Sequence, residues 1–214
     1  MRSTTSVVTP ARFAQGLTYA DFLAQIAINK DKFAQSYETV PLTDDDIAFF
    51  RKANAHAGGP TKILILAEAW CGDVYRELPT AIRIAEATGP VGSMEARIFF
   101  RDQNADIMDE FLHGEKKSRA IPVFVFYSAD HNYITHWTER SASAYAGLAT
   151  AMAEVKTELK LPQSATMGGL PDAERQNFLR ALIAKVEPPP EQWRKDAIKE
   201  IRENLGTALE IPNA

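Results

Sequence analysis

The chain has 214 residues, a formal charge of −4 and a hydrophobic fraction of 45%, a composition typical of a globular protein that buries a sizeable core. Acids and bases nearly balance and no polybasic cluster appears, which argues against a nucleic acid or an anionic membrane as partner. No apolar run is long enough to cross a membrane and residues 1–12 lack a signal-peptide core, so we expect a cytoplasmic protein.

Helical patterns fill the first part of the chain. A helix is expected from Thr18, whose side chain can cap it, followed by a shorter helical piece over residues 31–37. Thr43 precedes three aspartates that suit the positive end of a helix dipole. A metal could bind these acids instead, but the capping pattern favours a helix start. We expect residues 1–10 to be frayed and residues 1–60 to form a helical extension packed on the core.

The middle of the chain alternates strands and helices. The apolar run Lys62 to Leu66 shows no polar alternation, which predicts a strand covered on both faces. A helix should follow and end at Gly89-Pro90. The remaining expected elements are strands at 95–100, 123–127 and 133–138 and helices at 106–112 and 144–159. This order predicts a three-layer α/β/α sandwich over residues 61–161.

Two amphipathic helices are expected near the C-terminus. A polar, glycine-bearing linker runs from Pro162 to Gly169, and Pro188-Pro189-Pro190 separates the two helical patterns. Residues 170–214 therefore form a C-terminal helical extension. We expect it to pack on the α/β domain, with contact to a second copy as the alternative.

The most chemically informative residue is Cys71, the one cysteine in the sequence. No disulfide can form within the chain, and a cytoplasmic thiol stays reduced. Cys71 follows Trp70 at a predicted strand-to-helix junction, where free N–H groups and the helix dipole stabilise a thiolate and lower its pKa. The alternative is a small buried hydrophobic residue, as most lone cysteines are.

The surroundings of Cys71 resemble the thioredoxin superfamily. Its members have a W-C-G-x-C site, a helix-kinking proline eight residues after the first cysteine, and an Ile-Pro pair with a cis bond that faces the site. This chain has Trp70-Cys71-Gly72-Asp73, then Pro79, and later Ile121-Pro122. Further segments are similar to a bacterial branch that carries helices ahead of the domain and uses W-C-G-D-C: Leu17 to Tyr19, Asn29 to Phe33, and Arg101 to Phe111. The resemblance covers about residues 17–161.

The resemblance implies a thioredoxin-like fold with helical extensions and a site without metal or bound cofactor. Cys71 would be the catalytic thiol, and the substrate-binding residues would be Trp70, Gly72, Asp73, Val74, Ile121 and Pro122.

Two departures from the family pattern limit the chemistry. Val74 stands where the resolving cysteine would be, so the dithiol cycle is absent. Ile65 stands where family members bury an acid that helps proton transfer. Glu68 is close enough in sequence to replace that acid, although we favour a glutamate that points to solvent.

Two functions remain open. In the first, Cys71 forms a mixed disulfide with glutathione as co-substrate or with a protein thiol, and an external thiol releases it, as in a monothiol thiol–disulfide oxidoreductase. In the second, the protein is a redox-inactive binding module that holds an extended peptide beside the cis proline, between Ile121, Pro122 and Trp70. The pKa of Cys71 distinguishes the two.

Other kinds of site find no support in the sequence. Its four histidines show no metal-ligand spacing with Cys71; they are His56, His113, His131 and His136. No motif of a serine hydrolase or a dinucleotide-binding protein is present.

Overall fold

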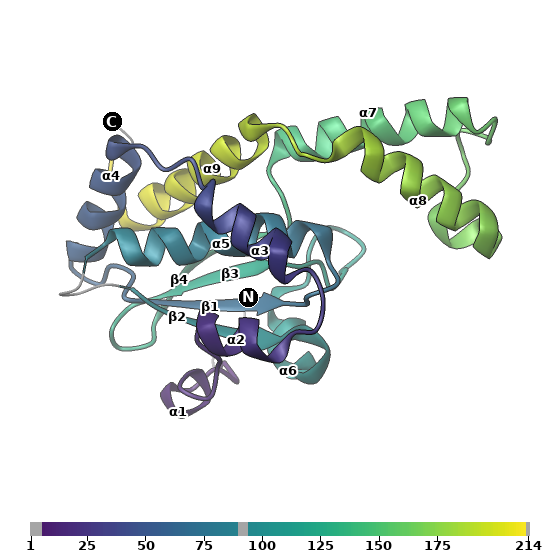
Figure 1. Cartoon of the computed structure of the whole chain (residues 1–214). Coiled ribbons are helices and arrows are strands. Elements are labelled where there is room, and N and C mark those ends of the chain that lie inside the picture. The colour runs from purple at the N-terminus through teal and green to yellow at the C-terminus, as the bar shows by residue number, and fades with distance from the viewer. Residues whose placement is uncertain (1–5, 90–93, 213–214) are drawn as a thin grey trace.

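One mixed sheet forms the centre of the molecule (Figure 1). We describe it from a computed structural model, in which residues 6–89 and 94–212 are described. The four strands lie in the order β2-β1-β3-β4. Their bounds are β1 (Lys62–Ala67), β2 (Glu95–Phe100), β3 (Val123–Tyr127) and β4 (Tyr133–Thr138). Strand β1 runs parallel to β2 and antiparallel to β3, and β3 runs antiparallel to β4.

The two central strands are buried on both faces. Every residue of β3 is buried, and so is every residue of β1 except Lys62 at its start. This explains why their sequences lack polar alternation. The predicted bounds of β2, β3 and β4 are confirmed, and β1 extends one residue beyond its prediction.

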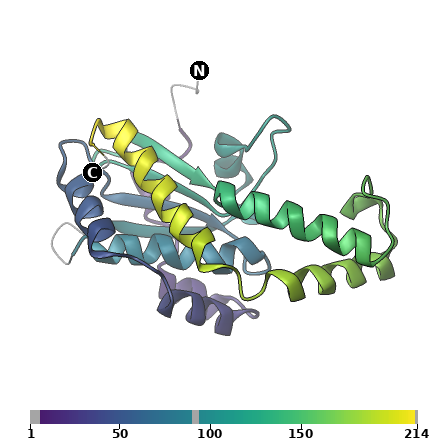
Figure 2. The ribbon, with the colours of Figure 1, turned by 90° about the horizontal axis from the view of Figure 1, so that it is seen from above.

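Helices cover both faces of the sheet, which confirms the three-layer α/β fold (Figures 1 and 2). On one face lie α5 (Gly72–Ala87) and α9 (Glu191–Leu209), with α3 (Lys30–Glu38) packed on α5 and α4 (Asp44–Ala55) packed on α9. On the other face lie α1 (Pro10–Phe13), α2 (Tyr19–Gln25) and α6 (Ala105–Met108). Short 3-10 helices are found at Arg101–Gln103, Asp109–Phe111 and Met167–Gly169.

Local capping explains where the N-terminal helices begin. Thr18 accepts a hydrogen bond from the Asp21 amide at the start of α2. Thr43 and Asp46 form a reciprocal capping box at the start of α4, and Asp46 also accepts from Arg202 Nη1 of α9 at 2.7 Å. The aspartates after Thr43 therefore begin a helix, as predicted.

The prediction that residues 1–10 are frayed is wrong for residues 6–10; residues 1–5 lie outside the described part of the chain. The Val7 amide donates to Glu110 Oε1 at 2.5 Å, and Val8 is buried. Thr9 then caps α1. The anchor comes from a residue about a hundred positions away, which local sequence does not reveal.

Helices α7 (Ala142–Glu158) and α8 (Asp172–Val186) form an antiparallel arm that extends past the end of the sheet (Figures 1 and 2). We expected both C-terminal helices to pack on the α/β domain; α9 turns back and packs on its strand β4, whereas α8 packs on its last helix, α7. In the described residues, no helix has the length and apolar character needed to cross a membrane.

Candidate functional site

The site lies where β1 passes into α5. Strand β1 ends at Ala67, and Cys71 is the N-cap residue of α5. The Cys71 amide donates to the Glu68 carbonyl at 3.2 Å, which closes the turn between strand and helix. A hydrogen bond from Asn29 Nδ2 to the Ala69 carbonyl, at 2.9 Å, ties the turn to the start of α3.

Strand pairing brings the Ile121–Pro122 segment to this turn. Leu66 is paired with Val123 across β1 and β3, so the residues before Val123 lie beside the residues after Leu66. The Ile121–Pro122 peptide bond is cis. Cys71 Sγ donates to the Ile121 carbonyl oxygen at 3.7 Å. Two segments fifty residues apart thus meet at the thiol.

Trp70 forms the exposed wall of the site, with 54% of its surface accessible. The guanidinium of Arg101 lies 5.0 Å from the centre of its ring, within the range of a cation–π contact. Arg101 Nη1 also donates to the Arg119 carbonyl at 3.1 Å, which joins this wall to the loop before Ile121. Sequence reasoning gave Arg101 no role at the site.

The family of the chain follows from its match to a sequence profile. Residues 16–154 match the profile of a protein family described as thioredoxin. The chain belongs to this thioredoxin family. It is similar in structure to a protein of unknown function from Pseudomonas aeruginosa and to an HIV epitope scaffold, each with a TM-score of 0.56 and 14% identity over 94% of this chain and 99% of the other. No curated protein matches the chain.

Four of the six residues expected to bind substrate in this thioredoxin-family site are buried: Asp73, Val74, Ile121 and Pro122. Val74 is fully buried in the core. Asp73 is 8% exposed and uses both carboxylate oxygens, one to accept from Arg76 and the other from Arg140. The side chains of Asp73 and Val74 therefore pack and bond inside the protein and do not face solvent at the site. Gly72 is the first residue of α5, and a Cβ there would find only ordinary contacts.

Burial raises the pKa of the Cys71 thiol, and the negative charge of Asp73 adds to this effect. The amides of Val74 and Asp73 and the Arg140 guanidinium act in the opposite direction, but they do not outweigh burial. The lowered pKa expected for a thiol at a helix N-terminus is therefore not found. At neutral pH the thiol stays protonated, in keeping with its hydrogen bond to Ile121.

Glu68 is not the solvent-facing side chain that we favoured. It is 8% exposed, and its Oε1 accepts from the Asp102 amide at 2.8 Å. Burial raises the pKa of this carboxyl. The hydrogen bond with Asp102 joins the end of β1 to the turn that follows β2, which gives Glu68 a structural role. Ile65, which stands where family members have a buried acid, is itself buried in β1.

Two of the four histidines have tyrosine partners. His113 contacts Tyr145, and His136 contacts Tyr133. Within the described ranges, no group of three or more His, Cys, Asp or Glu side chains is arranged to hold a metal ion.

Proposed function

We propose that this thioredoxin-family chain is a redox-inactive binding module that holds an extended peptide segment beside Pro122. The observation that carries the proposal is the state of its thiol. Cys71 is partly buried, donates a hydrogen bond to the Ile121 carbonyl and has a raised pKa. Such a thiol is a poor nucleophile at neutral pH, and Val74 leaves it without a resolving partner.

The surface around the thiol supports peptide binding. Trp70 presents a large aromatic face, a type of side chain that is enriched in protein interfaces. The Ile121 amide donates to no acceptor within the part of the chain that the structure describes. An unpaired backbone N–H beside an exposed aromatic ring suits an extended segment, whose carbonyl would accept from Ile121 while a side chain packs on Trp70.

Monothiol exchange is the second candidate. Cys71 is not fully buried, and the amides of Asp73 and Val74 lower the pKa of its thiol. In this reaction the Cys71 thiolate attacks a disulfide of glutathione or of a protein, one sulfur leaves as a thiolate, and a mixed disulfide remains. An external thiol then releases Cys71 and carries away the bound group.

We further infer that the chain represents the bacterial W-C-G-D-C branch with its second cysteine replaced by Val74, and that it acts in the cytoplasm. The sequence Trp70-Cys71-Gly72-Asp73 and the helices ahead of β1 support this assignment. Neither candidate function requires a bound cofactor.

A peptide-binding experiment tests the leading proposal. Peptides are first selected on the immobilised protein from a random display library. Their affinity is then measured for the wild type and for three variants. Cys71→Ser should bind them like the wild type, because the thiol takes no covalent part. Trp70→Ala should weaken binding by about tenfold or more, as expected when an interface aromatic is lost. Tyr133→Ala is the matched control, since this exposed tyrosine lies at the far end of β4.

Thiol reactivity decides between the two candidates. Under the binding proposal, the alkylation rate of Cys71 by iodoacetamide should keep rising above pH 8.5, the approximate pKa of a free thiol. Oxidised glutathione should modify the protein slowly at neutral pH. Rapid formation of a glutathione adduct at pH 7, together with loss of peptide binding in Cys71→Ser, would establish monothiol exchange instead.

A further inference from the structure

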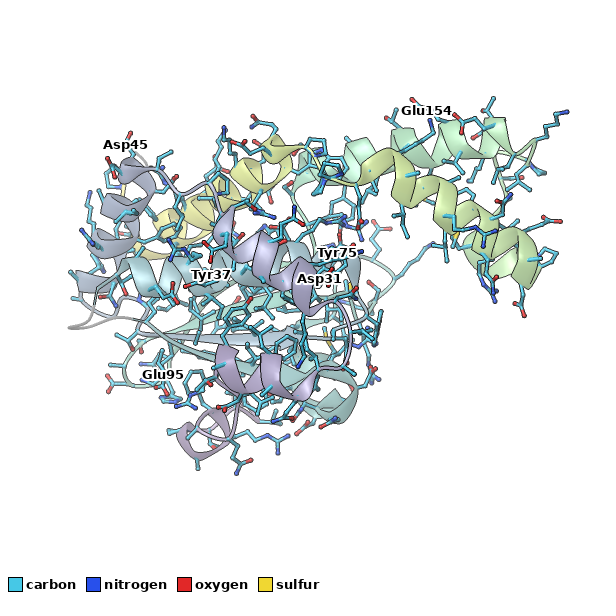
Figure 3. The ribbon with its side chains drawn as sticks, viewed as in Figure 1. Asp31, Tyr37, Asp45, Tyr75, Glu95 and Glu154 are labelled. Atoms are coloured by element: carbon cyan, nitrogen blue, oxygen red, sulfur yellow. The ribbon has the colours of Figure 1, made fainter. Side chains whose placement is uncertain are left out.

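A cavity lies between α3, the first turns of α5 and the segment that joins α8 to α9, and Cys71 is not among the residues that line it. Its volume is about 540 Å³, within the range of small-molecule sites. Tyr75, labelled in Figure 3, lies on the wall that α5 contributes. The side chains used below are Lys32, Tyr75, Glu77, Glu187, Trp193 and Arg194.

Several charges in the wall neutralise one another. Lys32 Nζ lies 3.3 Å from Glu187 Oε2, and Tyr75 donates to the other oxygen of Glu187. Arg76, also in the wall, donates to Asp73 instead of to a group in the cavity. These groups form a polar frame whose charges already have partners.

Glu77 has no such partner. It is 4% exposed, and its Oε2 is buried without a hydrogen bond to any residue that the structure describes. Burial raises the pKa of Glu77 to about 7, although the charges of Arg194 and Arg76 act to lower it. A buried polar atom without a partner is costly, so this carboxyl group is suited to a ligand that donates a hydrogen bond.

Arg194 supplies the opposite charge. Its Nη1 donates to the carbonyls of Ser36 and Thr39 at 3.1 and 3.0 Å, which holds the side chain against α3. The hydrogen bonds of Arg194 within the described chain all start from Nη1, so Nε and Nη2 remain for a ligand. This edge of a guanidinium fits a carboxylate with two parallel hydrogen bonds.

An apolar wall stands beside these charges. Trp193 and the prolines 188–190 line the cavity. Trp193 packs so closely on α7 that a Cβ at Gly147 would lie 2.3 Å from its ring. Ser141 Oγ also donates to the Trp193 carbonyl at 2.9 Å. Trp193 is therefore held in place before any ligand arrives.

We propose that this cavity binds a small zwitterion of the α-amino-acid type, either a free amino acid or a dipeptide. Its ammonium group donates to Glu77, its carboxylate accepts from Arg194, and its side chain packs on Trp193. The charges disfavour other classes of ligand. A phosphate ester would meet the carboxyl group of Glu77, and a polyamine would meet the guanidinium of Arg194.

Calorimetric titration with matched probes tests the proposal on the full-length protein. L-Leucine and glycyl-L-leucine carry both charges, N-acetyl-L-leucine lacks the ammonium group, and L-leucinamide lacks the carboxylate. At least one zwitterion should bind saturably below about 10 mM, and its singly charged analogue should bind about tenfold more weakly or worse. The stronger of the two zwitterions identifies a free amino acid or a dipeptide as the source.

Two variants assign the charges. Glu77→Gln keeps the shape of the side chain but removes the negative charge, and Arg194→Lys keeps the charge but removes the paired donors. Each should weaken zwitterion binding by about tenfold. Glu203→Gln and Arg180→Lys are the controls, because both residues are exposed and neither lines the cavity. The proposal is overturned if neither zwitterion binds, if N-acetyl-L-leucine binds as tightly as the stronger of the two zwitterions, or if Glu77→Gln binds like the wild type.

Discussion

Val74 is the residue that limits the chemistry of the site. It lies on the first turn of α5, three positions after Cys71, and its side chain is completely buried. A cysteine is close to valine in size, so this position accepts a thiol without a large cost in packing. The absence of a dithiol cycle therefore follows from one side chain and not from the shape of the fold.

Val74→Cys provides the test at this scale. We expect the variant to reduce an insulin disulfide slowly at pH 7, with dithiothreitol as electron donor. The rate should then increase by nearly tenfold per pH unit up to about pH 8.5, because it follows the thiolate fraction of Cys71, whose pKa burial raises. Insulin precipitation measures the rate. Val155→Cys, an equally buried position on α7, should stay inactive. A rate for Val74→Cys that is independent of pH between about 6 and 8 would contradict the raised pKa.

How much of the site the sequence reveals depends on how local each signal is. Cys71 and the Ile121–Pro122 segment were expected to face each other from the family resemblance, and the thiol does contact the Ile121 carbonyl, because β1 and β3 are paired next to the two segments. The raised pKa of Cys71 was not predicted, because it arises from burial by the completed fold. Arg140 was missed for the same reason, since it reaches Asp73 from 67 positions away.

At the scale of elements, strands and capped helices were predicted best. Three strands have their predicted bounds, because short apolar runs between turn signals are local features. The arm of α7 and α8 was not predicted, because the helical pattern of α8 does not show which surface it contacts. Glu77 and Arg194 were not predicted as binding residues either. Their cavity forms only when the segment between α8 and α9 packs near α5.

The contact between α7 and α9 can be tested at Gly147. Gly147→Ala should raise helix propensity in α7 by about 0.5–1 kcal/mol, but overpacking against Trp193 should cost about 1–3 kcal/mol. We therefore expect a net loss of about 1 kcal/mol in the free energy of unfolding, measured with urea. Gly168→Ala is the control, because a Cβ at Gly168 meets nothing within 4 Å. An unchanged or higher stability in Gly147→Ala would show that Trp193 is not tightly held.

At the scale of the whole molecule, α9 completes the core of the α/β unit. Ile198, Ile201 and Leu205 are buried within the main hydrophobic cluster. Glu200 accepts from Trp137 Nε1 of β4 at 2.8 Å and from the Ala142 amide at 2.7 Å, so it also holds the start of α7. We therefore expect that residues 61–161, although predicted as a domain, depend on the C-terminal helix for stability.

A chain that ends at Leu161 tests this dependence. Each buried Ile or Leu side chain contributes roughly 1.5–3 kcal/mol, so the loss of these side chains of α9 removes roughly 5–9 kcal/mol from a total stability of about 5–15 kcal/mol. The shortened chain should show no cooperative thermal transition by circular dichroism. In the full chain, Ile201→Ala should cost about 2–5 kcal/mol, whereas Lys199→Ala on the exposed face of α9 should change stability by less than about 0.5 kcal/mol. If the shortened chain unfolds cooperatively with the same thermal midpoint as the full chain, α9 does not contribute to the stability of residues 61–161. The cavity that α9 lines could then be removed without loss of the thioredoxin fold.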